Sequence, residues 1–270
     1  MKKILKFFFG KTFSGEKFVN SLVANLLGLQ IFRYIVGNTF YNIKYIFHKN
    51  KNFYLKNGYI VLENFLPENE FLLLRDEFNL ATENFEATHI YVDERIQNKY
   101  RNLYKFAKNE KVLSFFTNNE LKKKLDIVVR LEKLKTKIND EVDKNKFFHY
   151  DAYYNTFKAW YHLHDVSIEQ GPLNYVENSH NFSLSRLLIE WKASIKYSLL
   201  KNKKDWPGYG ISNKKYNHYN NISKKFTVKK NTLIFANTHG LHRRGDSIND
   251  AQRNTIHFYT RESPFKIFFN

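Results

Sequence analysis

The chain has 270 residues and a formal net charge of +18, from 44 basic and 26 acidic side chains. This length fits one large domain or two small ones, and a hydrophobic content of 43% can fill a sizeable core, which excludes an intrinsically disordered chain. The absence of cysteine excludes disulfides, thiolate metal sites and a cysteine nucleophile. A bound metal would therefore need His, Asp or Glu ligands, which suit iron, manganese or zinc.

The positive charge indicates an attraction to nucleic acid, to an anionic membrane or to an anionic small substrate. Much of it lies in short lysine runs such as 122–124 and 201–204, and a solvated lysine-rich surface is the more common reason for such runs. The sequence contains no zinc finger, RNA-recognition signature or basic helix. A basic nucleic-acid-binding protein therefore stays an alternative rather than the first interpretation.

Residues 1–50 are expected to form a helical extension ahead of a main domain at 51–270. Apolar residues repeat at the spacing of one helix face over 16–47: Val19, Leu22, Val23, Leu26 and Leu27. This helix could lie on a membrane surface, although packing on the main domain is more common. Neither a signal peptide nor a transmembrane stretch is indicated, so the expected location is the cytoplasm, with peripheral membrane contact left open.

Between residues 57 and 125 the sequence predicts one strand and then helices, and after residue 126 it predicts mainly strands. Asn57 and Gly58 predict a turn before a strand at 59–62, Pro67 predicts a helix start, and apolar spacing predicts a further helix over 110–125. From residue 126 short strands divided by turns predict a sandwich or barrel: 127–131, 147–150, 157–165, 174–176, 226–228, 233–236 and 254–260. A helix is expected at 182–200 and a surface loop at 201–225.

His149 and Asp151 are the first candidate metal ligands. Residues i and i+2 of a strand share a face, so this imidazole and this carboxylate are expected to point into one space. Such a pair with a third His from elsewhere makes a 2-His-1-carboxylate facial triad, which leaves the opposite coordination positions open.

His242 is the expected third ligand, because it follows the apolar run 233–236. Arg253 comes eleven residues later and alternates with Thr255 on one face of the next strand. A buried unpaired guanidinium is costly, so an Arg aimed into a cavity predicts an anion there, and a planar fork matches a carboxylate.

With these motifs in place, the chain resembles the phytanoyl-CoA dioxygenase family over residues 55–262. The matching features are the opening strand after Asn57, the His149–Asp151 motif with the strand after it, the Gly171–Val176 segment followed by Ser179 and His180, and a distal His with its Arg. The resemblance implies an α+β fold with a double-stranded β-helix (jelly-roll) core and flanking helices.

The resemblance also implies the activity and the cofactors. His149, Asp151 and His242 would hold Fe(II), and Arg253 would hold the far carboxylate of 2-oxoglutarate, with the Thr255 hydroxyl as a second donor. The enzyme would be a non-haem oxygenase that uses O₂ to hydroxylate a small-molecule, lipid or sugar-linked metabolite. The carboxylate ligand Asp151 argues against halogenation.

Several alternatives stay open at this point. His239 stands three residues before His242 and could replace it as the distal ligand, although the spacing to Arg253 favours His242. His162, His164 and Glu169 match the metal-binding core of a cupin, but the flanking glycines of that motif are misplaced and Arg253 would be unexplained. His180 is expected to hydrogen-bond in a turn. Lys158 opens the strand after the His149–Asp151 motif and could face the pocket, although a position in solvent is the first expectation.

Overall fold

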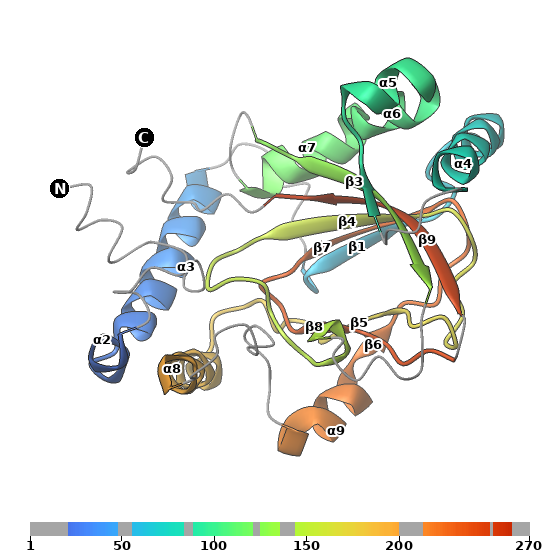
Figure 1. Ribbon diagram of the computed structural model, residues 1–270. Coiled ribbons are helices and arrows are strands. Elements are labelled where there is room, and N and C mark those ends of the chain that lie inside the picture. Colours follow the sequence, from blue (N-terminus) through green and yellow to red (C-terminus); the bar gives the residue numbers. More distant parts are fainter. Residues whose placement is uncertain are drawn as a thin grey trace.

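The computed structural model describes residues 21–47, 56–83, 89–120, 125–135, 144–199, 213–248 and 251–260. Within these ranges helices surround two antiparallel sheets (Figure 1), which confirms the predicted mixture of helices and strands. None of the helices in these ranges is long and apolar enough to cross a membrane.

The N-terminal helices α2 (Leu22–Leu26) and α3 (Leu29–Phe47) run beside helix α8 (Leu184–Leu199) (Figure 1). They are separated at Gly28, whose φ of 91° is a left-handed conformation that only glycine adopts freely. The indole Nε1 of Trp191 on α8 donates to the backbone oxygen of Asn25 at 2.8 Å. The predicted helix over 16–47 is thus confirmed, with one break, for residues 21–47; residues 16–20 lie outside the described part.

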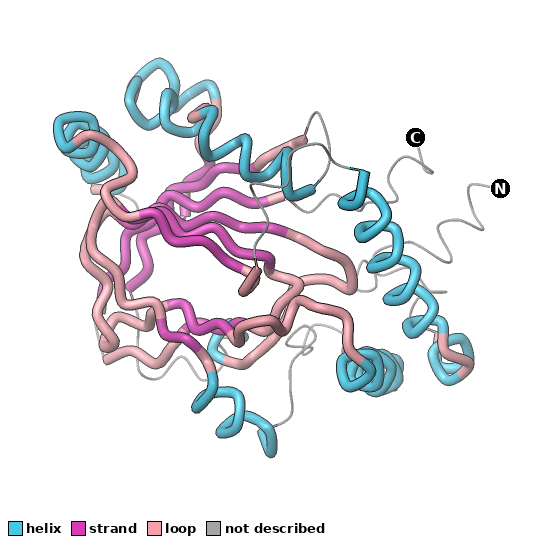
Figure 2. Tube along the Cα trace, turned by 180° about the vertical axis from the view of Figure 1, so that it is seen from behind, coloured by secondary structure: helices cyan, strands magenta, loops and turns pink. Residues whose placement is uncertain are grey.

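The larger sheet has six strands, and each hydrogen-bonded pair is antiparallel. Its strands lie in the order β1 (Tyr59–Leu62), β7 (Thr232–Asn237), β4 (Phe157–His162), β9 (Gln252–Tyr259), β3 (Val128–Lys135) and β2 (His89–Tyr91). The other sheet has the order β6 (Lys224–Lys225), β5 (Leu173–Tyr175) and β8 (His242–Arg244), and it lies opposite the larger one (Figure 2).

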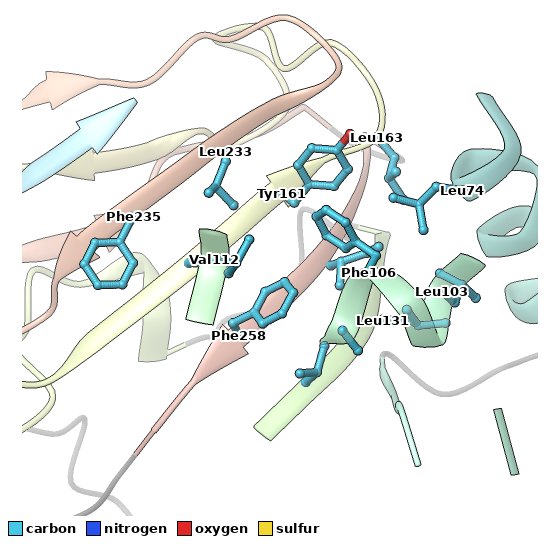
Figure 3. Close-up of a cluster of buried hydrophobic side chains, with 14 of the residues drawn as sticks. Leu74, Leu103, Phe106, Val112, Leu131, Tyr161, Leu163, Leu233, Phe235 and Phe258 are labelled. Carbon is cyan, nitrogen blue, oxygen red and sulfur yellow. The ribbon is translucent and has the colours of Figure 1, made fainter. Parts of the chain in front are cut away.

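One face of the larger sheet packs against helices α4 (Glu68–Thr82), α6 (Arg101–Ala107) and α7 (Glu110–Glu120), and α5 (Glu94–Lys99) precedes α6. Helix α4 begins after Pro67, as predicted, and places Phe71, Leu74 and Phe78 on the buried side at helical spacing. Figure 3 shows side chains of this core meeting between the helices and the sheet.

Strand alternation divides β4 between this core and the space that faces the second sheet. Phe157, Ala159 and Tyr161 are part of the apolar core, whereas the side chains between them belong to the opposite face. On β9 the same rule places Ile256 and Phe258 in the core. The polar residues of both strands therefore face inward between the sheets, where the candidate site lies.

The segment 213–225 differs from its prediction as a surface loop, since it forms helix α9 (Asn213–Ile222) and strand β6. Its composition is polar, and the stability of such a helix comes from tertiary contacts that composition does not reveal. The ring of Tyr219 packs 6.1 Å from that of Phe148, and Asn220 accepts a 2.9 Å hydrogen bond from Arg243. Residues 201–212 lie outside the described part of the chain.

Two of the predicted strands are reduced to isolated bridges, and the strand predicted at 157–165 ends at His162. Residues 147–150 follow the 3₁₀ turn η2 (Lys144–Lys146) and make only an isolated bridge, at His149. Residues 226–228 lie just after β6 and contribute an isolated bridge at Val228. Helices α5 and α6 and strand β2 had no prediction, and α5 begins at a capping Asp93 whose carboxylate accepts from the backbone N–H of Arg95.

Candidate metal centre

His149, Asp151 and His242 come together from two segments that are far apart in the sequence. The backbone N–H of His149 donates to His242, and that of His242 donates back to His149, both at 3.0 Å. The N–H of Asp151 donates to the backbone oxygen of Thr238, also at 3.0 Å. The first segment is therefore extended at its ligands, and the side chains of His149 and Asp151 fall on one side, as the i and i+2 argument predicts.

The three side chains form a compact group of metal-ligating atoms. Oδ1 of Asp151 lies 4.0 Å from Nε2 of His149 and 3.9 Å from Nε2 of His242, and the two imidazole centroids are 4.5 Å apart. Among the residues that the structure describes, this is the one group of three or more His, Asp or Glu residues close enough to share an ion.

The hydrogen bonds of both histidines fix their tautomers. Nδ1 of His149 lies 2.7 Å from the backbone oxygen of Phe147, and Nδ1 of His242 lies 2.9 Å from that of Gly240. Because a carbonyl oxygen only accepts, each Nδ1 carries the proton and each Nε2 keeps its lone pair. Burial lowers the pKa of His149 and lowers that of His242 to about 3. Both rings are thus neutral and present Nε2 as a donor atom for a metal.

Lys158 of β4 supplies the counter-charge of Asp151. Its Nζ lies 2.7 Å from Oδ2, the oxygen other than the one nearest the histidines, and its side chain is only 16% exposed. Burial raises the pKa of Asp151, but the positive charge of Lys158 lowers it by more, so the pKa of Asp151 lies well below its usual range. The expectation that Lys158 lies in solvent was therefore wrong.

A cavity of about 120 Å³ extends from the two histidines between the sheets. The described side chains that line it include five cations and one carboxylate: Arg130, Lys158, Arg243, Arg244 and Arg253, with Glu132. Part of this charge is neutralised within the protein, since Arg130 pairs with Glu132 at 2.7 Å and Arg243 with Asp246 at 2.9 Å. The excess of positive charge in the lining favours anions over cations in this cavity.

Arg253 lies in the wall of this cavity, as its position on β9 predicts. Its Nη1 donates to the backbone oxygen of Gly171, and its Nε is buried without a hydrogen-bond partner. No carboxylate pairs with it among the described residues. Burial lowers the pKa of Arg253 to about 10, with Glu132 opposing the shift and Arg244 adding to it. A charged and incompletely paired guanidinium in this position calls for an external anion.

The structure places Thr255 differently from Arg253. Its side chain is fully buried, and its hydroxyl donates to Oε2 of Glu132 at 3.4 Å. Thr255 does not line the cavity beside Arg253. For Thr255 to donate to a bound ligand, its hydroxyl would have to break the hydrogen bond to Glu132 and turn toward the ligand.

The two alternative metal sites are not assembled. His162 is buried in the cavity wall, but His164 and Glu169 are exposed, and these three residues form no common group of ligand atoms. His239 points away from the triad: its Nδ1 donates to the backbone oxygen of Ala152 at 2.9 Å, and its ring stacks on Tyr34 at 5.6 Å. The residues of the cupin alternative are thus not grouped, and the histidine that lies with His149 and Asp151 is His242 rather than His239.

Arg130 and Glu132 carried no recognised signal in the sequence, whereas alternation places His257 on the strand face of Arg253 although no role at the site was expected for it. Arg130 and Glu132 project inward from β3, and His257 stacks on Trp160 with ring centroids 5.3 Å apart. Nε of Arg130 donates to Nδ1 of His257 at 3.0 Å. Strand alternation would have placed each on the polar face, but only the pairing of β3 with β9 and of β9 with β4 brings them into one wall.

No protein-family model and no curated protein matches this chain. Solved structures do match. SnoN, a non-haem alpha-ketoglutarate-dependent epimerase from nogalamycin biosynthesis, matches at 14% identity and a TM-score of 0.49, over 82% of this chain and 83% of that one. HygX from Streptomyces hygroscopicus, with nickel and 2-oxoglutarate bound, matches at 18% identity and a TM-score of 0.45 over 76% and 83%. AviO1 from Streptomyces viridochromogenes Tue57 matches at 12% identity and a TM-score of 0.46, over 77% of this chain and 91% of that one.

Proposed function

We propose that this protein is a non-haem Fe(II) oxygenase that uses 2-oxoglutarate as its co-substrate. The observation that carries the proposal is the group formed by His149, Asp151 and His242, which opens onto a cavity with a guanidinium in its wall. Two neutral imidazoles and one carboxylate are a ligand set that suits Fe(II) and leaves coordination positions free.

The residues present fit such an ion. Both Nε2 atoms are held as lone-pair donors by the hydrogen bonds at Nδ1, and Asp151 is ionised. Its contact with Lys158 leaves Oδ1 nearest the histidines, which favours one carboxylate oxygen as the ligand. Bound iron would supply the activation of O₂, a chemistry that no side chain can perform.

Arg253 is the residue that favours 2-oxoglutarate over other co-substrates. Its planar fork can hold a carboxylate through two charge-assisted hydrogen bonds. A dicarboxylate that reaches from the ligand group to Arg253 would place one end at the metal and the other on the guanidinium. Thr255 would join it as a donor once released from Glu132.

We also propose a double-stranded β-helix (jelly-roll) fold and membership of the phytanoyl-CoA dioxygenase family. Two facing antiparallel sheets with the ligands between them suit a double-stranded β-helix core, and the sequence motifs resemble the phytanoyl-CoA dioxygenase family. We assign residues 51–270 to the oxygenase domain and 1–50 to an N-terminal helical extension.

The substrate is proposed to be a small-molecule, lipid or sugar-linked metabolite that is hydroxylated. The same cavity is lined by more cations than carboxylates, which favours a substrate that carries negative charge. The carboxylate ligand argues against halogenation.

The testing experiment is anaerobic reconstitution with Fe(II), followed by exposure to O₂ with 2-oxoglutarate and measurement of succinate. Wild type should form succinate and the Asp151→Ala variant should not. Wild type that neither binds Fe(II) nor forms succinate, but binds single-stranded nucleic acid with an affinity that falls as salt rises, would favour the nucleic-acid alternative.

A further inference from the structure

Arg186 of helix α8 contacts both segments that carry the candidate ligands. Its guanidinium carbon lies 3.3 Å from the centre of the Tyr150 ring, and Tyr150 stands between His149 and Asp151. Its Nη1 donates to the backbone oxygen of His239 at 2.9 Å, three residues before His242. One side chain therefore bridges the two ligand segments, which backbone hydrogen bonds also join.

We infer that Arg186 is a positioning residue for the metal centre, which sets the spacing of the two ligand segments without touching the ion. This inference rests on the proposed function, because it takes His149, Asp151 and His242 as the ligands. Its basis is geometric: a planar group with five N–H donors can lie flat on an aromatic ring while it donates at its edges, which a lysine cannot do.

The charge of Arg186 is neutralised by Glu190, one turn further along α8. Nε and Nη2 of Arg186 both lie 3.1 Å from Oε1 of Glu190, and both residues are buried. A pair this deep costs desolvation energy and is weak evidence for a purely stabilising role. Here the pair has a further consequence, because it aims the remaining edge of the guanidinium at His239.

The N-terminal helix α3 completes the arrangement. Nε2 of Gln30 donates to Oε2 of Glu190 at 2.9 Å, and Nη1 of Arg33 lies 3.3 Å from Oε1 of Gln30. All these side chains are buried. The chain of contacts runs from α3 through α8 to the ligand segments, so the N-terminal helices take part in supporting the site.

A second side-chain hydrogen bond, made by His239, also connects the two ligand segments. Its Nδ1–H bonds to the oxygen of Ala152, the residue after Asp151. Arg186 holds the backbone of His239 while His239 holds the backbone after Asp151. Loss of the guanidinium should therefore loosen both ligand segments together.

The experiment measures Ni²⁺ binding, as an oxygen-insensitive probe, by calorimetry on the full-length protein. Arg186→Met should weaken Ni²⁺ binding by ~10-fold to 100-fold, the range for residues that orient metal ligands. Arg186→Lys, which keeps the charge but not the fork, should recover only part of this loss. Glu190→Gln keeps the volume of the side chain and should weaken binding in the same direction, even if the Arg186 variants do not fold.

The matched control is Glu77→Gln in the outer helical layer. Glu77 is also multiply hydrogen-bonded, since it accepts from the backbone and side chain of Asn102 and from the backbone of Leu103 at 2.7–2.9 Å. It belongs to α4, however, and its partners belong to α6. Its loss should lower the Tm without changing the affinity for Ni²⁺.

Two outcomes separate the inference from the proposed function. If wild type binds Ni²⁺ and the variants at 186 and 190 bind it within a factor of about two of wild type, while their Tm falls as in the control, Arg186 is only structural and the inference is overturned. If wild type binds no Ni²⁺ at all, the metal centre itself and the proposed function fail.

Discussion

The ammonium of Lys158 lies 2.7 Å from Oδ2 of Asp151, on the edge of the group formed by the candidate ligands. The contact has two effects on metal binding. It keeps Asp151 ionised at low pH, and it holds Oδ2 away from the position where an ion would sit.

We predict that Lys158→Met makes metal binding more sensitive to acid. Removal of a charge this close should raise the pKa of Asp151, and a neighbouring opposite charge is worth about 1–3 units. Lys158 also lowers the pKa values of His149 and His242, so protons should compete with the metal at a higher pH at all three ligands. The midpoint for Ni²⁺ release in a pH titration should rise by about one unit.

The control for this titration is Lys192→Met, an exposed lysine on α8. Its midpoint should equal that of wild type. Equal midpoints for all three proteins would show that Lys158 has no influence on the ligands.

His242→Ala should abolish metal-dependent succinate formation, whereas His239→Ala should only weaken it. His242 presents Nε2 to the group, and His239 uses its Nδ1–H on the backbone of Ala152. Activity and Ni²⁺ affinity of both variants would be measured side by side. Retention of full affinity in His242→Ala together with its loss in His239→Ala would reverse the assignment of the distal ligand.

The positions of the candidate ligands could be predicted from the sequence because side-chain alternation is a local rule. His149 and Asp151 share a side even though their segment is not a regular strand, since its backbone is extended by bonds to His242 and Thr238. The same rule separates Tyr161 in the core from His162 in the cavity.

Contacts between distant segments could not be predicted in this way. The partner of Lys158 depends on how β4 passes the His149 segment, and nothing in the local pattern reports that pairing. Helix α9 was missed because its stability depends on contacts such as that of Tyr219 with Phe148. The bridge formed by Arg186 requires α8 to be placed against both ligand segments.

Buried His162 predicts a loss of stability in acid that is independent of the metal. Burial, with a contribution from Arg253, lowers the pKa of His162 to about 3, so the folded state resists a proton that the unfolded state accepts below about pH 6.5. The stabilising contribution is therefore complete above pH 6.5 and is lost as the pH falls toward 3. Between pH 7 and pH 5 the loss is about 2 kcal/mol for this one side chain.

Urea unfolding with a chelator present would measure this effect. His162→Gln should show a smaller fall in unfolding free energy between pH 7 and pH 5 than wild type. His218→Gln, which changes an exposed residue of α9, should behave as wild type. Parallel pH profiles for wild type and His162→Gln would contradict the prediction.

The exposed apolar residues of α2 and of its C-cap, Leu27, predict binding to a membrane surface. Val23, Leu26 and Leu27 are 66%, 51% and 84% exposed, on the helix face that the sequence pattern marked as apolar. Replacement of all three by Ser should reduce sedimentation with anionic vesicles, because buried apolar area and electrostatic attraction together drive such binding. Wild type that does not sediment with these vesicles at low salt would rule the contact out.

Arg253 gives the sharpest test of the co-substrate. Its Nη1 is held on the backbone of Gly171, and no described carboxylate neutralises it, so the guanidinium is available for an external carboxylate. Two charge-assisted hydrogen bonds are worth about 1.5–3 kcal/mol each. Arg253→Ala should therefore raise the concentration of 2-oxoglutarate needed for half-maximal succinate formation by about two orders of magnitude. Ni²⁺ affinity should be nearly unchanged, because Arg253 is not among the ligands.

The variants around Arg253 separate charge from geometry. Arg253→Lys keeps the charge but cannot form the fork, so it should recover only part of the lost affinity. Arg75→Ala removes an arginine from the outer helix α4 and should leave the 2-oxoglutarate titration unchanged. In a second measurement, 2-oxoglutarate is titrated into the anaerobic Fe(II) protein, so that binding is separated from turnover. If wild type and Arg253→Ala titrate alike, the guanidinium does not hold 2-oxoglutarate, and the metal group alone would then support the proposed function.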